Sequence, residues 1–292
     1  MHALWSASLE GWMRLSWIRP ESAQIVWMQN GTMHAVNWRL VWITVVAFVA
    51  GMMNAVAGGG SLLSFPAMLG IGLGPIEANA TNTLALWPGQ FASIAGYWGE
   101  IRKLKSMAVW MGLAGLLGGA IGATLLLRTP AGIFMKLVPW LLLTAALIFA
   151  FSGPWQRHFQ QRKQTHSPAA HPSGHAFWMV LMTMLICFYI GYFGAGAGFL
   201  LIAMMTLFGL EDLHQMNALK VVATTMANGV ACLLFILGGK VVWQYCLAAM
   251  LTCAMGGYVA SRSAKRLNPR MLRSMVVVLG FTLAAYFFWK SY

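Results

Sequence analysis

The stretch Ala57-Gly58-Gly59-Gly60 interrupts an apolar run, and Ala195-Gly196-Ala197-Gly198 interrupts another 138 residues later. At that offset nine positions recur without a gap: Ala57, Gly58, Gly60, Leu62, Leu63, Leu69, Asn79, Ala80 and Ala85 recur as Ala195, Gly196, Gly198, Leu200, Leu201, Leu207, Asn217, Ala218 and Ala223. Duplicated apolar halves, each with a glycine-broken helix, are typical of secondary transporters whose site lies between the repeats. Chance similarity of Leu- and Ala-rich helices is the alternative, and the shared glycines and the Asn-Ala pair count against it.

The composition excludes a soluble protein. The chain of 292 residues is 59% hydrophobic and 9% charged, against roughly 45–50% and about 25% in soluble domains. Runs such as Leu40–Ala57 and Met107–Leu127 contain no charge, and a bilayer span needs about 20 apolar residues. We therefore expect an all-α integral membrane protein.

The net charge of +13 does not indicate a nucleic acid partner. Most Lys and Arg residues lie in short segments between apolar runs, where they set the orientation of membrane spans. The four cysteines lie within apolar segments and are interpreted as packing residues. We predict no disulfide framework, no metal site and no cofactor.

Ten runs are apolar and contain at most one charged residue each, five in each half. The first half contains Leu40–Ala57, Ser61–Leu73, Ala78–Trp98, Met107–Leu127 and Ile133–Phe151, and the second contains Ala176–Phe193, Phe199–Leu210, Met216–Leu237, Val242–Ala260 and Met271–Trp289. The second run of each half is too short for an ordinary span, because thirteen helical residues cover only about 20 Å. It is either a re-entrant piece or a half-helix completed by the glycines before it.

These runs predict four parts of the chain. Residues 39–151 form a first transmembrane repeat, 152–175 a polar, proline-containing cytoplasmic linker, and 176–292 a second repeat. Residues 1–38 are a basic, Trp-rich extension without the apolar core of a signal peptide. This extension is either an interfacial segment or a tail.

The basic residues favour crossing by the short runs. If the short runs cross, the basic loops near Arg102 and Arg266 lie on the same side as the linker; if they do not cross, the two densest basic loops face opposite sides. Five crossings per half make the second repeat inverted relative to the first. The sequence thus predicts about ten helices, two of them short or broken, in two inverted five-helix repeats, with both termini outside.

The residues around the first break resemble a known family. The resemblance is carried in the first half by Asn54-Ala55-Val56-Ala57-Gly58-Gly59-Gly60, Pro66, Pro75, Ala80-Thr81-Asn82 and Gly96-Tyr97, and in the second half by Asn217-Ala218-Leu219-Lys220 and Gly239-Lys240-Val241-Val242-Trp243. Together these segments are similar to the TauE/SafE family of bacterial sulfite and organosulfonate exporters. The resemblance covers the chain from about Leu40 to Trp289. It implies transport of a small, often sulfur-containing anion across the bacterial inner membrane. The family often has a basic residue straight after the tyrosine, whereas here Trp98-Gly99-Glu100-Ile101 precedes Arg102.

The glycine breaks are the first candidate for binding this anion. Unpaired N–H groups and the positive end of the helix dipole attract anions to a helix start. Gly58, Gly59 and Gly60 precede one such start, and Gly196 and Gly198 precede the other. Close helix packing through small residues is the alternative.

Lys220 is the second candidate, because a cation inside an apolar run is costly and typical of a functional site. Snorkelling of its long stem to the interface is the alternative. At the repeat offset Lys220 takes the place of Asn82, and Asn79, Thr81 and Asn217 lie nearby in the repeats. These side chains supply donors that suit sulfite or sulfonate oxygens.

The expected partners are therefore a small anionic solute and the lipid bilayer, with a homodimer left open. No carboxylate lies in mid-span, so the sequence identifies no coupling ion. An intramembrane serine protease is excluded, since residues 194–198 contain no serine and the spans contain no histidine. A non-transporting membrane subunit that assists another complex remains the alternative to a transporter.

Overall fold

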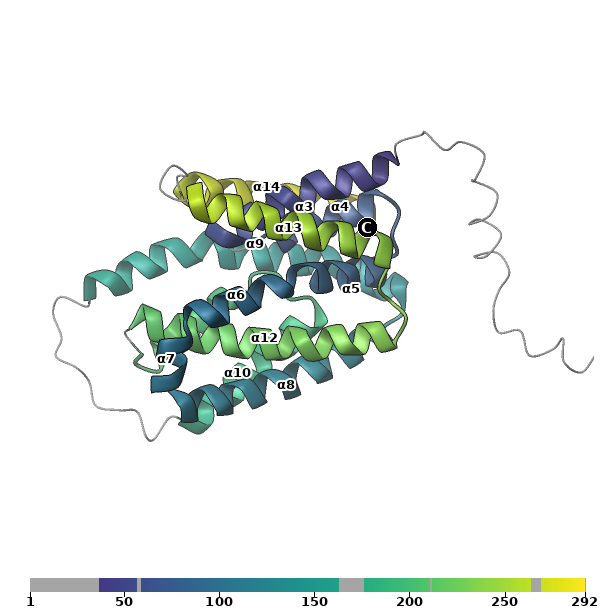
Figure 1. The fold of residues 1–292 in the computed structure, drawn as a ribbon. Coiled ribbons are helices and arrows are strands. Elements are labelled where there is room, and N and C mark those ends of the chain that lie inside the picture. The colour runs from purple at the N-terminus through teal and green to yellow at the C-terminus, as the bar shows by residue number, and fades with distance from the viewer. Residues whose placement is uncertain (1–36, 57–58, 163–175, 211, 264–268, 292) are drawn as a thin grey trace, which may run out of the picture. The chain divides into compact units, whose positions relative to one another are not determined.

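The computed structural model describes residues 37–56, 59–162, 176–210, 212–263 and 269–291. Contacts divide the chain into Met1–Trp38 and Arg39–Tyr292, and the fold is that of the second unit. Every regular element in the described ranges is a helix (Figure 1), which confirms the all-α prediction. The helices are α3 (Trp38–Val56), α4 (Ser61–Gly70), α5 (Pro75–Leu86), α6 (Pro88–Gly96), α7 (Trp98–Lys103), α8 (Lys105–Arg128), α9 (Ala131–Arg162), α10 (Ala176–Tyr192), α11 (Ala197–Leu207), α12 (Leu213–Leu237), α13 (Trp243–Ser263) and α14 (Pro269–Ser291). Residues 1–36 of the predicted extension lie outside the described ranges.

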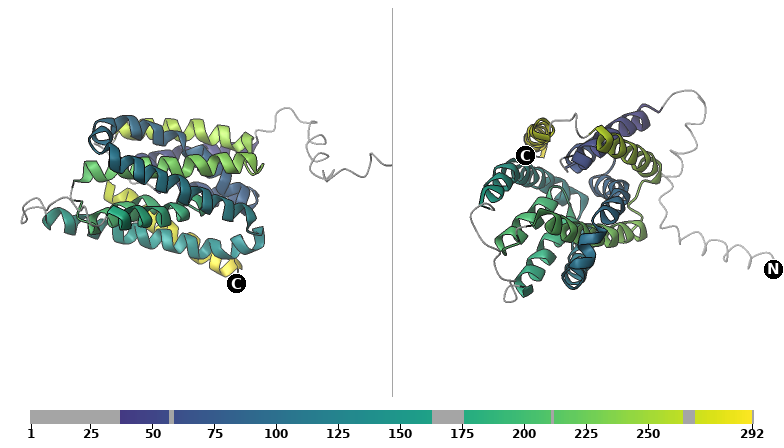
Figure 2. Two further views of the ribbon diagram at one scale, coloured as in Figure 1. Left: turned by 90° about the horizontal axis from the view of Figure 1, so that it is seen from below. Right: turned by 60° about the vertical axis from the view of Figure 1, so that its left-hand side comes forward.

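Four of the described helices, α3, α8, α9 and α12, are long and apolar enough to cross a membrane. Four more apolar helical segments are shorter: Ser61–Gly70, Phe177–Tyr192, Ala197–Leu207 and Val277–Lys290. The long helices of the unit lie side by side along a common direction (Figure 2). The prediction of an integral membrane protein agrees with this arrangement, while the count of ten spans stays a prediction.

Helix α8 shows how the sequence separates a lipid-facing surface from a packing surface. Its large exposed side chains recur at every fourth position, as expected for one stripe of a helix: Val109, Leu113, Leu117, Ile121 and Leu125. In water such an apolar stripe would be unfavourable, whereas hydrocarbon solvates it. The outward stripe of α8 is therefore suited to lipid.

The opposite face of α8 is built from glycines that allow close contact with two neighbours. A Cβ at Gly115 would lie 2.5 Å from the carbonyl oxygen of Ala223 on α12, and one at Gly119 would lie 2.5 Å from that of Ala227. Cβ atoms at Gly118 and Gly122 would collide with the backbone of α10. Small residues thus bring α8 into backbone contact with α10 and α12, which is the usual way for membrane helices to associate.

Two predicted segments differ in the structure. The run predicted over 78–98 is divided into α5, α6 and α7, because Pro88 cannot donate the backbone hydrogen bond that would continue α5, and Tyr97 interrupts the helix again. The run predicted to end at Phe151 continues as α9 to Arg162, so helix occupies much of the predicted linker. The rest of that linker, 163–175, lies outside the described residues.

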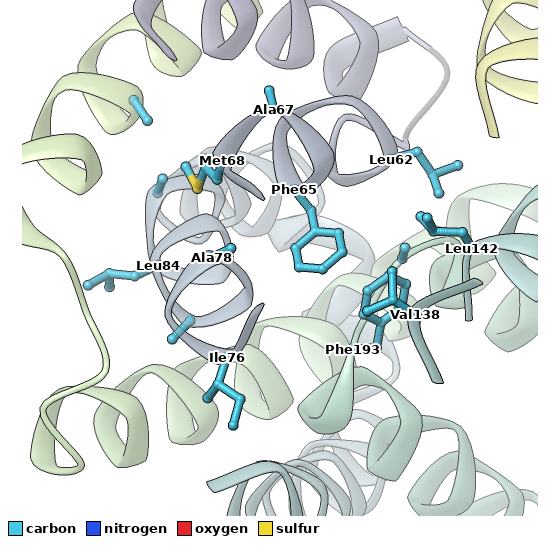
Figure 3. Packing of buried hydrophobic residues seen from close by; sticks show 14 of the residues in the cluster. Leu62, Phe65, Ala67, Met68, Ile76, Ala78, Leu84, Val138, Leu142 and Phe193 are labelled. Carbon is cyan, nitrogen blue, oxygen red and sulfur yellow. The ribbon is translucent and has the colours of Figure 1, made fainter. Parts of the chain in front are cut away.

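One of the two buried clusters includes residues of α4, α5 and α9. Phe65 of α4 and Phe193, which follows α10, pack edge to face with ring centroids 5.2 Å apart, and Val138 and Leu142 of α9 lie beside them (Figure 3). Helix α4 contacts α5 and α14, and α11 contacts α9, α10 and α12. The two short helices are therefore enclosed by longer ones, where irregular backbone before them is protected from lipid.

Candidate functional site

Both predicted glycine breaks are present as sharp changes of chain direction. Gly59 (φ +85°) follows α3 and precedes α4, while Gly194 (φ +82°) and Gly196 (φ +77°) lie between α10 and α11. Positive φ is the left-handed region that glycine adopts without steric cost. Gly60 and Gly196 occupy the N-cap positions and offer no side chain to cap the helix starts. Gly58 lies outside the described residues.

The ring of Phe149 on α9 joins the two breaks. A Cβ built on Gly59 would overlap Cζ of this ring, and one built on Gly196 would lie 3.4 Å from Cε2. Phe149 is 1% exposed, and its ring packs edge to face on Phe199 of α11 with centroids 4.9 Å apart. The starts of α4 and α11, far apart in sequence, therefore contact neighbouring edges of one side chain.

Polar side chains surround the start of α4. The N–H of Gly60 donates to Oδ1 of Asn54 at 3.2 Å. The hydroxyl of Ser64 donates toward the carbonyl oxygen of Gly60 at 3.0 Å and toward Oδ1 of Asn82. Asn82 is 2% exposed and lies beside the first break, where a binding role would require it to be.

Lys220 lies at the start of α11. A Cβ on Gly198 would be 3.5 Å from Cδ of Lys220, so the lysine stem lies along the glycine. Its ammonium group donates to Oδ1 of Asn217 at 2.7 Å, and Asn217 in turn donates to the carbonyl oxygen of Leu213 at 2.8 Å. The ion pairs among the described residues are Glu100–Lys103 and Glu77–Lys240, and neither of them involves Lys220. A half-buried positive charge thus faces the second break with a neutral amide as its acceptor.

The remaining two candidates have different surroundings. Asn79 of α5 donates to the carbonyl oxygen of Tyr192 at 3.2 Å, which holds the end of α10 just before the second break. Its own Oδ1 is buried without a hydrogen-bond partner among the described residues. Thr81 accepts from the N–H of Val242 at 3.0 Å and so caps the approach to α13. The structure therefore brings Asn79 to a break, whereas the Thr81 hydroxyl is engaged elsewhere.

Sequence reasoning missed three residues at the breaks: Phe149, Ser64 and Tyr189, whose hydroxyl donates to the carbonyl oxygen of Ala195 at 2.9 Å. Ser64 could have been found, because a hydroxyl one turn after a glycine-started helix lies near that start. Phe149 could not, since a phenylalanine in an apolar helix carries no local signal.

One ion pair joins the two halves away from the breaks. Glu77 at the start of α5 accepts from Lys240, which follows α12, at 2.9 Å, and both side chains are about one-third exposed. The positions at the repeat offset are Gln215 and Arg102, and the Arg102 guanidinium lies 5.2 Å above the ring of Trp98. Because glutamine carries no charge, the equivalent residues Gln215 and Arg102 cannot form a second ion pair of this kind.

The membrane-length helices, two enclosed helix breaks and a half-buried cation beside the second break define the class of membrane transporters. The family model described as "Sulfite exporter TauE/SafE" matches residues 43–287, and the chain belongs to this family. A probable membrane transporter protein of Haemophilus influenzae is 30% identical over 242 residues, covering 82% of this chain and 91% of the relative. The probable membrane transporter protein YfcA of Escherichia coli K12 is 28% identical over 249 residues (85% and 88%). A probable membrane transporter protein of Sinorhizobium, ORF9, is 28% identical over 253 residues (84% and 90%). No solved structure matches.

Proposed function

We propose that this chain is a secondary transporter that exports a small anion, sulfite or a sulfonate or related sulfur-containing acid, across the bacterial inner membrane by alternating access of two inverted five-helix repeats. The observation that carries the proposal is the meeting of both glycine breaks at Phe149, with the Lys220 charge beside the second break. A half-buried cation and two helix starts whose N-cap residues are glycines form a compact positive region that suits an anion.

The helix boundaries support the repeat. Four pairs of helix starts are 138 residues apart: Trp38 and Ala176, Pro75 and Leu213, Lys105 and Trp243, Ala131 and Pro269. The indole N–H of Trp87 also donates to the carbonyl oxygen of Thr225 at 3.1 Å, and these residues are separated by the same 138 positions. In a two-fold arrangement, equivalent residues touch only near the axis. This contact therefore supports a pseudo-two-fold axis beside Trp87.

The direction of the helices supports inversion. Glu77 near the start of α5 contacts Lys240 beyond the end of α12, while Trp87 contacts Thr225 in the middle of α12. Helix α12 and its equivalent, α5 with α6, thus run in opposite directions. Gly115 and Gly119 of α8 face Ala223 and Ala227 of α12 in the same order, and Gly118 and Gly122 face Met184 and Phe188 of α10 in the same order. Helices α10 and α12 then run parallel, which supports a crossing by α11 between them.

Topology mapping tests the inverted arrangement. Single cysteines replacing Lys103, Gln161 and Lys265, in a variant whose four native cysteines are alanine, should all react only with a reagent that reaches the cytoplasm. A cysteine replacing Lys136 should react only from outside, because the basic loops stay inside. Labelling of positions 103 and 265 from opposite sides would contradict two inverted repeats.

The Glu77–Lys240 pair offers a test of alternating access. We expect it to stabilise the state closed to the outside, since it joins the two repeats at the end with few basic loops. Exposed pairs contribute at most about 1 kcal/mol, so Glu77→Lys should raise outside accessibility of the breaks by about 2- to 5-fold. Accessibility is measured by labelling a cysteine placed at Ser64.

The matched control for this ion pair is chemically similar but local. Glu100 and Lys103 form a 2.7 Å ion pair within one turn of α7, so Glu100→Lys should leave labelling at position 64 unchanged. The double variant Glu77→Lys with Lys240→Glu should return labelling to the wild-type rate. An equal response to Glu77→Lys and Glu100→Lys would show that net charge, not the contact between repeats, is responsible.

A substrate screen tests the anion. A deletion strain should become sensitive to one or more of sulfite, sulfonates and thiosulfate, and this chain should restore resistance. The alternative function, a non-transporting subunit, predicts sensitivity only when a partner complex is present. It also predicts no flux in vesicles that contain this chain alone.

A further inference from the structure

The ring of Phe149 fills the space between the two helix starts. Gly59 meets its Cζ edge and Gly196 its Cε2 edge, so closely that even a Cβ at Gly59 would overlap the ring. Phe199, the residue after Gly198, covers part of the same ring. Lys220 lies along Gly198 and Phe149 along Gly196, so both side chains lie at the start of α11, and an anion held between the two helix starts is placed beside the Phe149 ring.

We propose that Phe149 is the specificity-determining residue of the transporter and sets the size of the organic group that the anion can carry. The inference rests on the proposed function. While the ring fills this space, only a compact anion such as sulfite, or a sulfonate with a small substituent, can lie beside the helix starts. A bulky substituent would need the volume that the ring occupies.

Because the residues around Phe149 are apolar, we expect a substitution at Phe149 to change the size of the substituent that fits. Phe149 packs on Phe199 and Phe65 packs on Phe193, and all four rings belong to or pack against the same apolar cluster. Removing the Phe149 ring leaves an apolar space, and apolar cavities on the order of 150 Å³ stay dry and bind benzene. A truncated Phe149 should therefore accept an aryl group where the ring was, with the sulfonate at the helix starts.

The experiment measures competition against labelled sulfite in proteoliposomes. The unlabelled competitors are sulfite, methanesulfonate, 2-aminoethanesulfonate, benzenesulfonate and 4-toluenesulfonate. For Phe149→Ala we expect the inhibition constant of benzenesulfonate, relative to that of sulfite, to improve by about 10-fold or more, because a hydrophobic pocket discriminates by this order. Phe149→Leu should give a smaller improvement in the same direction, and it also provides a milder truncation that folds more readily.

Phe235→Ala is the matched control. Phe235 is also fully buried, but it lies in the last turn of α12, at the opposite end of that helix from Lys220. Its truncation should lower stability comparably and leave the benzenesulfonate-to-sulfite ratio unchanged. An unchanged ratio in both Phe149 variants, with sulfite still transported, would overturn the inference and leave the proposed function intact. Absence of flux for every anion in the wild-type protein would instead overturn the proposed function, and this inference with it.

Discussion

Gly59→Ala should abolish transport, whereas Gly72→Ala should retain most of it. Both glycines have positive φ, +85° and +95°, and a non-glycine residue there costs about 1–3 kcal/mol. The sites differ in space: a Cβ at Gly59 overlaps the Phe149 ring, while a Cβ at Gly72 meets nothing within 4 Å. Gly59→Ala thus displaces the side chain that joins the two breaks. Flux per folded molecule in proteoliposomes measures the effect.

Comparing flux in Gly59→Ala and Gly72→Ala separates the effect of backbone strain from the effect of contact with Phe149. Equal losses in both variants would attribute the effect to backbone strain alone, and wild-type flux in Gly59→Ala would show that the break serves neither binding nor packing. Gly198 supplies a further graded test, because its Cβ position lies at an ordinary 3.5 Å from Lys220. Gly198→Ala should therefore be tolerated, whereas Gly198→Leu should push the lysine away and abolish transport.

Lys220→Met should weaken anion binding by roughly 10- to 150-fold, since a hydrogen bond to a charged group contributes about 1.5–3 kcal/mol. Lys220→Arg should retain part of the affinity, because its guanidinium keeps the charge but has a different shape. Lys136→Met is the control, since Lys136 is an exposed cation on α9. Equilibrium binding of labelled sulfite to purified protein gives the affinities. Unchanged affinity in Lys220→Met would favour snorkelling, with the anion held by helix ends and amides.

The offset of 138 residues could be predicted from the sequence because glycines, prolines and polar residues mark where helices begin and end. Glycine runs and the fixed offset survive in the helix starts, and the short spacing from Asn217 to Lys220 places both on one face of α12. Pro88 lies inside the run predicted over 78–98, and it ends α5 because a proline removes a backbone hydrogen bond. Helix α9 continues to Arg162, beyond the predicted end at Phe151, because charged residues end the apolar part of a helix and not its backbone hydrogen bonding.

The site itself depends on contacts between distant segments, which one sequence does not encode visibly. Phe149 lies among many apolar residues of α9 and is selected only by what it touches, Gly59 and Gly196. Asn79 was predicted to face the anion, and its side chain holds the carbonyl oxygen of Tyr192 from the other half. Thr81 is predicted to bind the anion because it lies next to Asn82 in the sequence, whereas its hydroxyl accepts from the N–H of Val242 just before α13. Polar side chains in membrane helices have several uses, and tertiary contacts decide among them.

Solute counterflow tests anion transport by this chain most directly, because it needs neither a known coupling ion nor a known direction. Proteoliposomes that contain only this protein are loaded with unlabelled sulfite and diluted into labelled sulfite. We predict a transient accumulation of label that is absent from liposomes loaded with gluconate and strongly reduced in Lys220→Met. Label uptake equal to that of protein-free liposomes, for sulfite and for each sulfonate of the series, would contradict the account and favour a non-transporting subunit.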